Sequence, residues 1–352
     1  MRRALGLVTL WLSLASGATA RPELWQTSSL GDDVHVIDLE TRTLVQRVRV
    51  GPNPHGIAAP RDASVVFVSI ETDGSERGEL LWIDPRTLAI EHRLAVGPEP
   101  HQIATTPDGR FVYVPCRDGS YWVVDARARR VVTRIETGGR PHNTSASADG
   151  KRMLLSPMGT PRGVTVVDVA RGHRVIGTIP FAGSVRPPAL SADGRRLFQH
   201  VDGLNGFQLA DVPTRRVIAT IEHATPLGWL LVHPKLGWLG ARGLQRCHGL
   251  AITPDQREIW SVCGDAITVH AIDEPALRER ARLESEGKGY WITFSPDGRW
   301  AFVAITERDR VAIIDARRKR IEAYLEVGSG PKRNLVLDVE REASRAAASS
   351  PD

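Results

Sequence analysis

Short apolar runs alternate with turn residues along most of the chain, and they follow one another in a fixed order. The unit contains a Gly-Pro lead-in, an apolar run, a Pro-Asp-Gly-type turn, a second run, a polar loop, a third run ending in Asp, and a fourth run. Period-two patterning, or a short apolar run bounded by turn residues, predicts a β-strand. Each unit therefore predicts four short strands, and no long stretch has helical periodicity.

The third run with its terminal Asp is the clearest marker of the unit, and it occurs seven times. The copies read VHVIDLETRTL, LLWIDPRTLAI, YWVVDARARRV, VTVVDVARGHRV, FQLADVPTRRV, TVHAIDEPALRE and VAIIDARRKRI. A four-stranded unit that repeats every ~40–45 residues is typical of a β-propeller blade. We therefore expect an all-β fold, a seven-bladed β-propeller with four antiparallel strands per blade. The copy at residues 184–224 has the weakest third run, GFQLADV.

The two ends of the repeat array complement each other. Residues 21–51 supply only three runs, and GPKRNLVLDV at 330–339 supplies a fourth. We expect this last strand to complete the first blade, which removes free sheet edges from a propeller domain at residues 21–339. The small and polar residues 340–352 predict a disordered tail.

The repeated words resemble a known family. GPEPHQIATTPDGRFVYVP (97–115) and VHVIDLETRTLVQRVRVG (34–51) are similar to the YVTN-type seven-bladed propeller repeat of bacterial secreted and surface proteins. The resemblance covers nearly all of the chain after residue 20 and implies the propeller fold. Relatives include surface-layer-like proteins, lactonase-like propellers and haem-binding propellers of nitrite-reductase type, so the resemblance implies no single function.

One position of the repeat carries candidate chemistry. It lies seven residues before the turn Asp, and its occupants are His55, His101, His142, Arg186, His248 and Tyr290, with Lys332 at the matching place in the closing strand. This position begins the first strand of each blade, which is the innermost strand of a propeller. We expect these side chains to ring one mouth of the central channel, on condition that the strand pleat turns them inward.

The ring predicts a site for a small anionic or metal-bearing ligand. Imidazole is a frequent transition-metal ligand, so the candidate metal ligands are His55, His101, His142 and His248. Arg186 and Lys332 favour an anionic group. The resemblance adds a haem-type ligand, with a histidine as axial ligand and the cations pairing propionates. The alternative is that the histidine is only part of an amplified repeat, filling a turn and bonding backbone carbonyls.

The chain has three cysteines. If Thr253–Glu258 forms a hairpin turn, Cys247 falls opposite Cys263 or its neighbour, so a disulfide between these two is geometrically feasible in an exported protein. Cys116 is then unpaired, and it is either a small buried hydrophobe or a ligand or reactive thiol.

An insertion interrupts the repeat. The interval from Arg186 to His248 is longer than the others by about twenty residues, and the extra segment is TPLGWLLVHPKLGWLGARGL at 225–244. It emerges at the same mouth as the ring, so we expect a lid with Trp229 and Trp238 as ligand contacts. A structural plug or a dimer contact is the alternative.

The composition of the chain and its first residues indicate where the protein is located and which partners it has. MRR, the apolar ALGLVTLWLSLA and ATA before Arg21 are typical of a signal peptide over residues 1–20, which predicts a secreted protein, periplasmic in a Gram-negative source. No later segment is apolar enough to span a membrane. The 46 basic and 41 acidic residues are scattered, without a basic block that interleaves aromatics, which argues against nucleic-acid binding.

The sequence leaves three functions open. The first is ligand binding at the histidine mouth, with a transition metal or haem-type group as the cofactor. The second is a lactonase- or lyase-like, or metal-dependent, enzyme that uses the same mouth, although the sequence identifies no catalytic residue and carries no nucleophile elbow or phosphate-binding fingerprint. The third is a scaffold that binds another exported protein.

Overall fold

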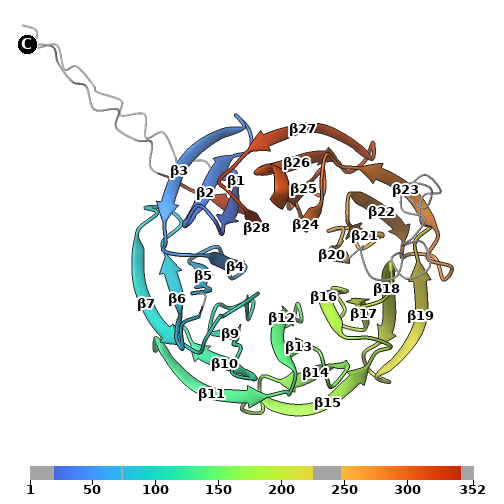
Figure 1. Ribbon diagram of the computed structural model, residues 1–352, viewed down its shortest axis with the longest axis horizontal. Coiled ribbons are helices and arrows are strands. Elements are labelled where there is room, and N and C mark those ends of the chain that lie inside the picture. The colour runs from blue at the N-terminus through green and yellow to red at the C-terminus, as the bar shows by residue number, and fades with distance from the viewer. Residues whose placement is uncertain (1–19, 73, 225–246, 342–352) are drawn as a thin grey trace, which may run out of the picture.

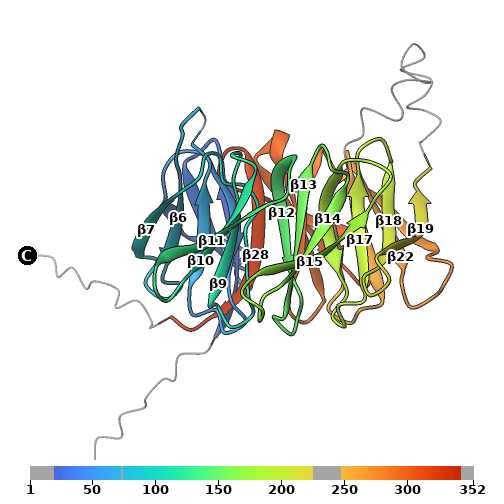
Figure 2. The same cartoon turned by 90° about the horizontal axis from the view of Figure 1, so that it is seen from below.

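The computed structural model describes residues 20–72, 74–224 and 247–341. Seven antiparallel sheets of four strands form a closed ring around a central axis (Figure 1). Seen from the side the ring is a disc, with the strands running between its two faces (Figure 2). The predicted seven-bladed β-propeller is therefore confirmed. The predicted insertion, with Trp229 and Trp238, lies outside the described residues.

The first four blades follow the order of the repeat. Blade 1 contains β1 (Arg21–Ser28), β2 (Asp33–Asp38), β3 (Thr43–Arg49) and the last strand, β28 (Pro331–Val339). Blade 2 contains β4 (Pro54–Ala58), β5 (Val66–Ile70), β6 (Gly78–Ile83) and β7 (Ile90–Val96). Blade 3 contains β8 (Ala104–Thr105), β9 (Phe111–Pro115), β10 (Ser120–Asp125) and β11 (Arg130–Glu136). Blade 4 contains β12 (Arg140–Ala146), β13 (Arg152–Met158), β14 (Gly163–Asp168) and β15 (Arg174–Pro180).

The last three blades have the same order. Blade 5 contains β16 (Val185–Leu190), β17 (Arg196–Val201), β18 (Gly206–Asp211) and β19 (Arg216–Glu222). Blade 6 contains β20 (Cys247–Ile252), β21 (Glu258–Cys263), β22 (Ala266–Ala271) and β23 (Glu279–Glu284). Blade 7 contains β24 (Gly289–Phe294), β25 (Trp300–Ile305), β26 (Arg310–Asp315) and β27 (Arg320–Glu326), with a short 3-10 turn at Thr306–Arg308 after β25.

Blade 1 closes the ring as the repeat pattern predicts. β28 pairs antiparallel with β1, with Arg21 opposite Val339 and Trp25 opposite Leu335. Directly after β28, Arg341 donates two hydrogen bonds to Glu23, from Nε to Oε1 (2.6 Å) and from Nη2 to Oε2 (2.8 Å). The chain ends of the propeller are thus joined by main-chain hydrogen bonds and a bidentate ion pair.

The hydrophobic core lies between neighbouring blades. Trp25 and Val36 of blade 1 pack in one buried cluster with Ile57, Val68 and Leu81 of blade 2. The outermost strands face solvent, as in the exposed residues of β3. Each blade therefore buries its inner three strands against the next blade, and this stacking holds the inner strands in a fixed position around the channel.

The Pro-Asp-Gly-type turns have a repeated hydrogen-bond pattern. In blade 4, Ser147 Oγ donates to Asp149 Oδ1 (2.6 Å), and the Lys151 backbone N–H donates to the same oxygen (3.0 Å). Gly150 follows with φ of +69°, a conformation that favours glycine. This pattern fixes the hairpin between the first two strands and so positions the start of the first strand. No helix among the described residues is long and apolar enough to cross a membrane.

Candidate ligand site at the channel mouth

The predicted ring residues converge at the starts of the innermost strands. His55, His142, His248 and Tyr290 lie on β4, β12, β20 and β24, and His101 lies just before β8. These strands surround the centre of the ring (Figure 1). Contacts between the ring side chains of successive blades show that the pleat turns the repeated position inward, which the sequence left open.

The aromatic rings of this position stack on one another. The ring centroids of His55 and His101 are 3.7 Å apart, as are those of His101 and His142, and His248 stacks on Tyr290 at 3.9 Å. Two longer contacts, His142 to His248 at 6.1 Å and His55 to Tyr290 at 6.2 Å, complete the circuit.

Hydrogen bonds fix how three imidazoles present their nitrogen atoms. His101 Nδ1 donates to the carbonyl oxygen of His142 (3.1 Å), and His248 Nδ1 donates to the carbonyl oxygen of Tyr290 (3.0 Å). Each acceptor is the equivalent residue of the next blade. His55 Nδ1 instead binds the Glu71 carboxylate (2.6 Å). Such bonds are the usual outer contacts of a metal-ligating histidine, because they leave Nε2 as the electron-pair donor.

Glu71 lies beside the ring but outside the repeated position. Ring nitrogens of His55 and His101 and a carboxylate oxygen of Glu71 lie within 4.8 Å of one another, a spacing compatible with one metal ion. Burial opposes ionisation of Glu71, but His55 and the nearby cations outweigh it and lower the pKa of Glu71. His142 and His248, also predicted metal ligands, belong to the ring but not to this three-residue group.

The imidazoles of the mouth are held in the neutral form. Burial, and then neighbouring positive groups, hold the pKa of His101, of His142 and of His248 well below the usual value. Burial also lowers the pKa of His55, against the opposing effect of Glu71. Neutral imidazole is the form that binds a metal ion, so proton competition at neutral pH is weak.

The predicted cations differ in their environments. Arg186 is 8% exposed, and its Nε donates to Asp202 Oδ1 (2.6 Å), so its charge is already paired. Lys332 is partly exposed, and its Nζ lies 4.8 Å from the Tyr290 ring centroid. Lys332 is therefore the predicted cation that remains available to an anionic ligand.

Sequence reasoning missed the most buried cation, Arg333. Its side chain is fully buried, lies 3.9 Å from the Trp291 ring and donates from Nη2 to Asn143 Oδ1 (3.2 Å), across the channel in blade 4. The Nε and Nη1 atoms of Arg333 have no hydrogen-bond partner among the described residues. Burial lowers the pKa of Arg333 to about 10, so it still carries its charge at neutral pH. A buried cation with unused donors favours a nearby anion.

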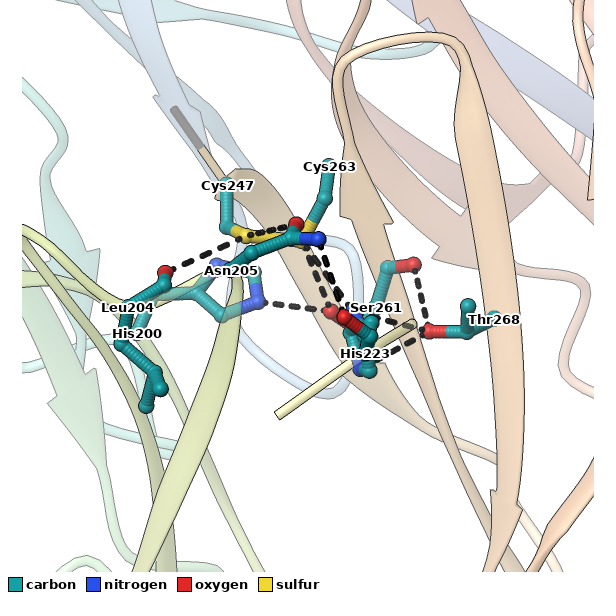
Figure 3. The surroundings of a disulfide bond; sticks show 8 residues. All are labelled: His200, Leu204, Asn205, His223, Cys247, Ser261, Cys263 and Thr268. Atoms are coloured by element: carbon teal, nitrogen blue, oxygen red, sulfur yellow. Dashed lines mark hydrogen bonds between the residues drawn. A yellow bond between two sulfur atoms is a disulfide. The ribbon is translucent and has the colours of Figure 1, made fainter. Parts of the chain in front are cut away.

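Two of the three cysteines lie in a separate region, in blade 6 beside blade 5, and the third lies in blade 3. Cys247 and Cys263 are directly opposed on β20 and β21 and form a disulfide, at the place where the hairpin register puts them (Figure 3). Cys116 is a free thiol, fully buried in an apolar cluster with Val96 and Val114, and burial raises its pKa well above the usual value. This environment favours a packing role for Cys116 over a reactive one.

Comparison with known proteins agrees with the architecture. The family model described as the cytochrome d1 haem domain matches residues 61–188. A hydrazine synthase structure from Kuenenia stuttgartiensis is 19% identical with a TM-score of 0.68, covering 81% of this chain and 95% of that chain. The dihydro-haem d1 dehydrogenase NirN in complex with DHE is 16% identical with a TM-score of 0.63, covering 89% of this chain and 74% of that chain. No curated protein sequence matches. At these identities the two structures are similar to this chain in fold.

Proposed function

We propose that this protein binds a small anionic, metal-bearing ligand of haem type at the histidine mouth of the channel. The observation that carries the proposal is the pair of imidazoles whose Nδ1 atoms are fixed by hydrogen bonds and whose Nε2 atoms are left for a ligand, on His101 and His248. When bound, the group would supply an iron centre for ligand or electron exchange.

The electrostatics of the mouth support an anionic partner. Lys332 and Arg333 bring positive charge to the ring, and Arg333 has unused donors. The Glu71 carboxylate is hydrogen-bonded to His55, so the negative charge of Glu71 is partly compensated. A carboxylate-bearing tetrapyrrole would pair with the free cation Lys332 while an imidazole nitrogen binds its metal. The match to the cytochrome d1 haem domain over residues 61–188 supports the same ligand class, and the YVTN-type repeat is compatible with it. We also propose that the protein is exported.

This proposal is tested on the purified full chain with its disulfide intact. Ferric haem, Zn²⁺ and Co²⁺ are added in separate titrations. We expect one equivalent of haem to bind with a shifted Soret band. His101→Gln and His248→Gln should each weaken binding by about tenfold or more. The matched control is His173→Asn, which alters a histidine in the turn before β15, where φ is +62° and Asn is tolerated.

The outcomes separate the candidate functions. Binding of bare ions without haem would restrict the ligand to a transition metal at the same imidazoles. Binding of neither probe, or binding insensitive to His101→Gln and His248→Gln, would refute the proposal and leave the scaffold function.

A second candidate, catalysis at the same mouth, is favoured by one further observation. Glu71, His55 and Tyr290 form a hydrogen-bonded chain, in which His55 Nδ1 contacts Glu71 Oε2 at 2.6 Å and its Nε2 contacts Tyr290 Oη at 3.3 Å. A carboxylate that orients an imidazole is the usual arrangement of a general base. Lactone hydrolysis that is lost in Glu71→Gln but kept in Cys116→Ala would support this function, and inactivity of the metal-free and metal-loaded wild type towards lactones would exclude it.

A further inference from the structure

A second group of buried histidines surrounds the disulfide. His200 lies on β17 in blade 5, His223 follows β19, and Cys247 and Cys263 face each other on β20 and β21 of blade 6 (Figure 3). One ring nitrogen of His200 and both sulfur atoms lie within 4.8 Å of one another. His223 Nδ1 lies 3.5 Å from Cys263 Sγ. One imidazole and two sulfurs thus share one small volume, and His223 adjoins it at Cys263 without belonging to this three-residue group.

The hydrogen bonds of these imidazoles leave nitrogen atoms for a further ligand. His200 is fully buried, its Nε2 contacts Ser261 Oγ at 2.9 Å, and its Nδ1 has no partner among the described residues. His223 is anchored mainly through Nε2, which contacts Thr268 Oγ1 at 3.0 Å, and its Nδ1 lies farther from the same oxygen, at 3.4 Å. Burial keeps both imidazoles neutral, since it holds the pKa of His200 well below its usual value and lowers that of His223 to about 3. A fully buried nitrogen without a partner is costly and calls for a ligand.

Backbone pairing would keep the two cysteines together after reduction. Cys247 and Cys263 are paired across two antiparallel strands, and after a register shift between Cys247 and Gly249 the pairing continues to Ile252 and Ile259. Only 16 positions separate them in the chain, and both are at most 4% exposed. Two cysteine thiolates and two histidines form a donor set that Zn²⁺ accepts in tetrahedral sites.

We propose that Cys247, Cys263, His200 and His223 form a redox-gated site for a zinc-type divalent ion, closed while the disulfide is present and opened by reduction. A dithiol reductant is oxidised to its disulfide, and its two electrons and two protons convert the Cys247–Cys263 bond into two thiols. The incoming divalent ion then displaces these two protons, and two thiolates balance its charge. This site is distinct from the channel mouth, and it stands whether or not the mouth binds haem.

Cobalt(II), an optical stand-in for zinc, tests the site in the full chain. The His101→Gln/His248→Gln protein serves as background, so that the channel mouth does not contribute. Half of the sample is reduced anaerobically with dithiothreitol, and the reductant is removed by gel filtration. We expect one additional equivalent of cobalt in the reduced half, with sulfur-to-cobalt charge-transfer absorption that the oxidised half lacks.

Matched variants assign the ligands. The Cys247→Ser/Cys263→Ser variant should abolish the sulfur-to-cobalt charge-transfer band, and His200→Gln should weaken cobalt binding by more than the about 10–100-fold that loss of an outer contact costs. Cys116→Ser and His270→Gln, which alter a distant thiol and a neighbouring histidine, should leave binding within about twofold. Circular dichroism checks that each variant is folded.

Three results would overturn the proposal. The first is a reduced, folded protein with two newly titratable thiols that takes up no additional cobalt. The second is cobalt–thiolate absorption that persists in Cys247→Ser/Cys263→Ser or disappears in Cys116→Ser. The third is a disulfide that dithiothreitol does not reduce in the folded protein. Failure of haem binding at the channel mouth changes none of these readouts.

Discussion

Buried neutral histidines should make this propeller sensitive to acid, and His223 allows the effect to be calculated. Burial, followed by the charges of His270 and Arg282, lowers the pKa of His223 to about 3. In the unfolded chain its pKa is about 6.5. Because the folded value is the lower one, the unfolded chain takes up the proton first. The neutral imidazole therefore stabilises the fold fully above about pH 6.5, and that contribution is lost as the pH falls towards 3.

When the pH is lowered from 7.5 to 5, this single histidine should reduce the free energy of unfolding by about 2 kcal/mol. The loss is about 1.36 kcal/mol for each pH unit below the pKa of the unfolded chain. His223→Asn removes this proton uptake. At pH 7.5 the variant should be less stable by about 1 kcal/mol, because it loses the contact with Thr268. At pH 5 the difference in free energy of unfolding between variant and wild type should have shifted by about 2 kcal/mol in favour of the variant.

Urea unfolding followed by tryptophan fluorescence at both pH values measures this change. Cys116→Ala is the control, since it removes a buried side chain whose raised pKa prevents titration in this range. The difference in free energy of unfolding between Cys116→Ala and wild type should be the same at both pH values. A His223→Asn difference that is equally independent of pH would refute the reasoning. His101, His142, His200 and His248 add to the acid sensitivity of the wild type in the same direction.

Three further predictions concern the mouth and the closure of the ring. Gly56→Ala should destabilise the protein by about 1–3 kcal/mol in urea unfolding, because the added Cβ would lie 2.4 Å from the His101 carbonyl oxygen; an unchanged midpoint would contradict this packing. Arg333→Met should weaken ferric haem binding by about tenfold, through loss of one charge-assisted interaction of about 1.5 kcal/mol, and unchanged affinity in an absorption titration would show that its charge is not used. Arg341→Ala should lower the free energy of unfolding by about 3 kcal/mol and lower the thermal midpoint, since Glu23 is 3% exposed and would lose its bidentate partner. Arg257→Ala, on an ion pair exposed on both sides, should change little.

Repetition in the sequence was enough to predict the blades, their number and the closing strand. It succeeds because each blade needs the same turn and the same buried strands to stack on its neighbour, so structural needs appear at a fixed period. Even blade 5, whose third run is the weakest, forms β18 at Gly206–Asp211, since packing against adjacent blades decides the outcome.

Repetition does not predict residues that depart from it. The repeat register selected Lys332, and because a shift of one residue in a strand exchanges the faces, it passed over the adjacent Arg333, which is the buried cation. Glu71 lies in the loop after β5 and meets His55 only once the blade is folded. The histidines near the disulfide come from different positions of their blades, so no period links His200 to His223. Such residues are found only through spatial proximity.

The repeated histidine also shows that a structural and a functional interpretation need not compete. His101 bonds the backbone carbonyl of His142, and His248 bonds that of Tyr290, so the same contact joins neighbouring blades in two separate places. This is the structural role that an amplified repeat would retain. The same bond, however, consumes Nδ1, fixes the tautomer and leaves Nε2 as the electron-pair donor. A contact retained to join blades therefore also produces an array of imidazoles in the form that binds a metal.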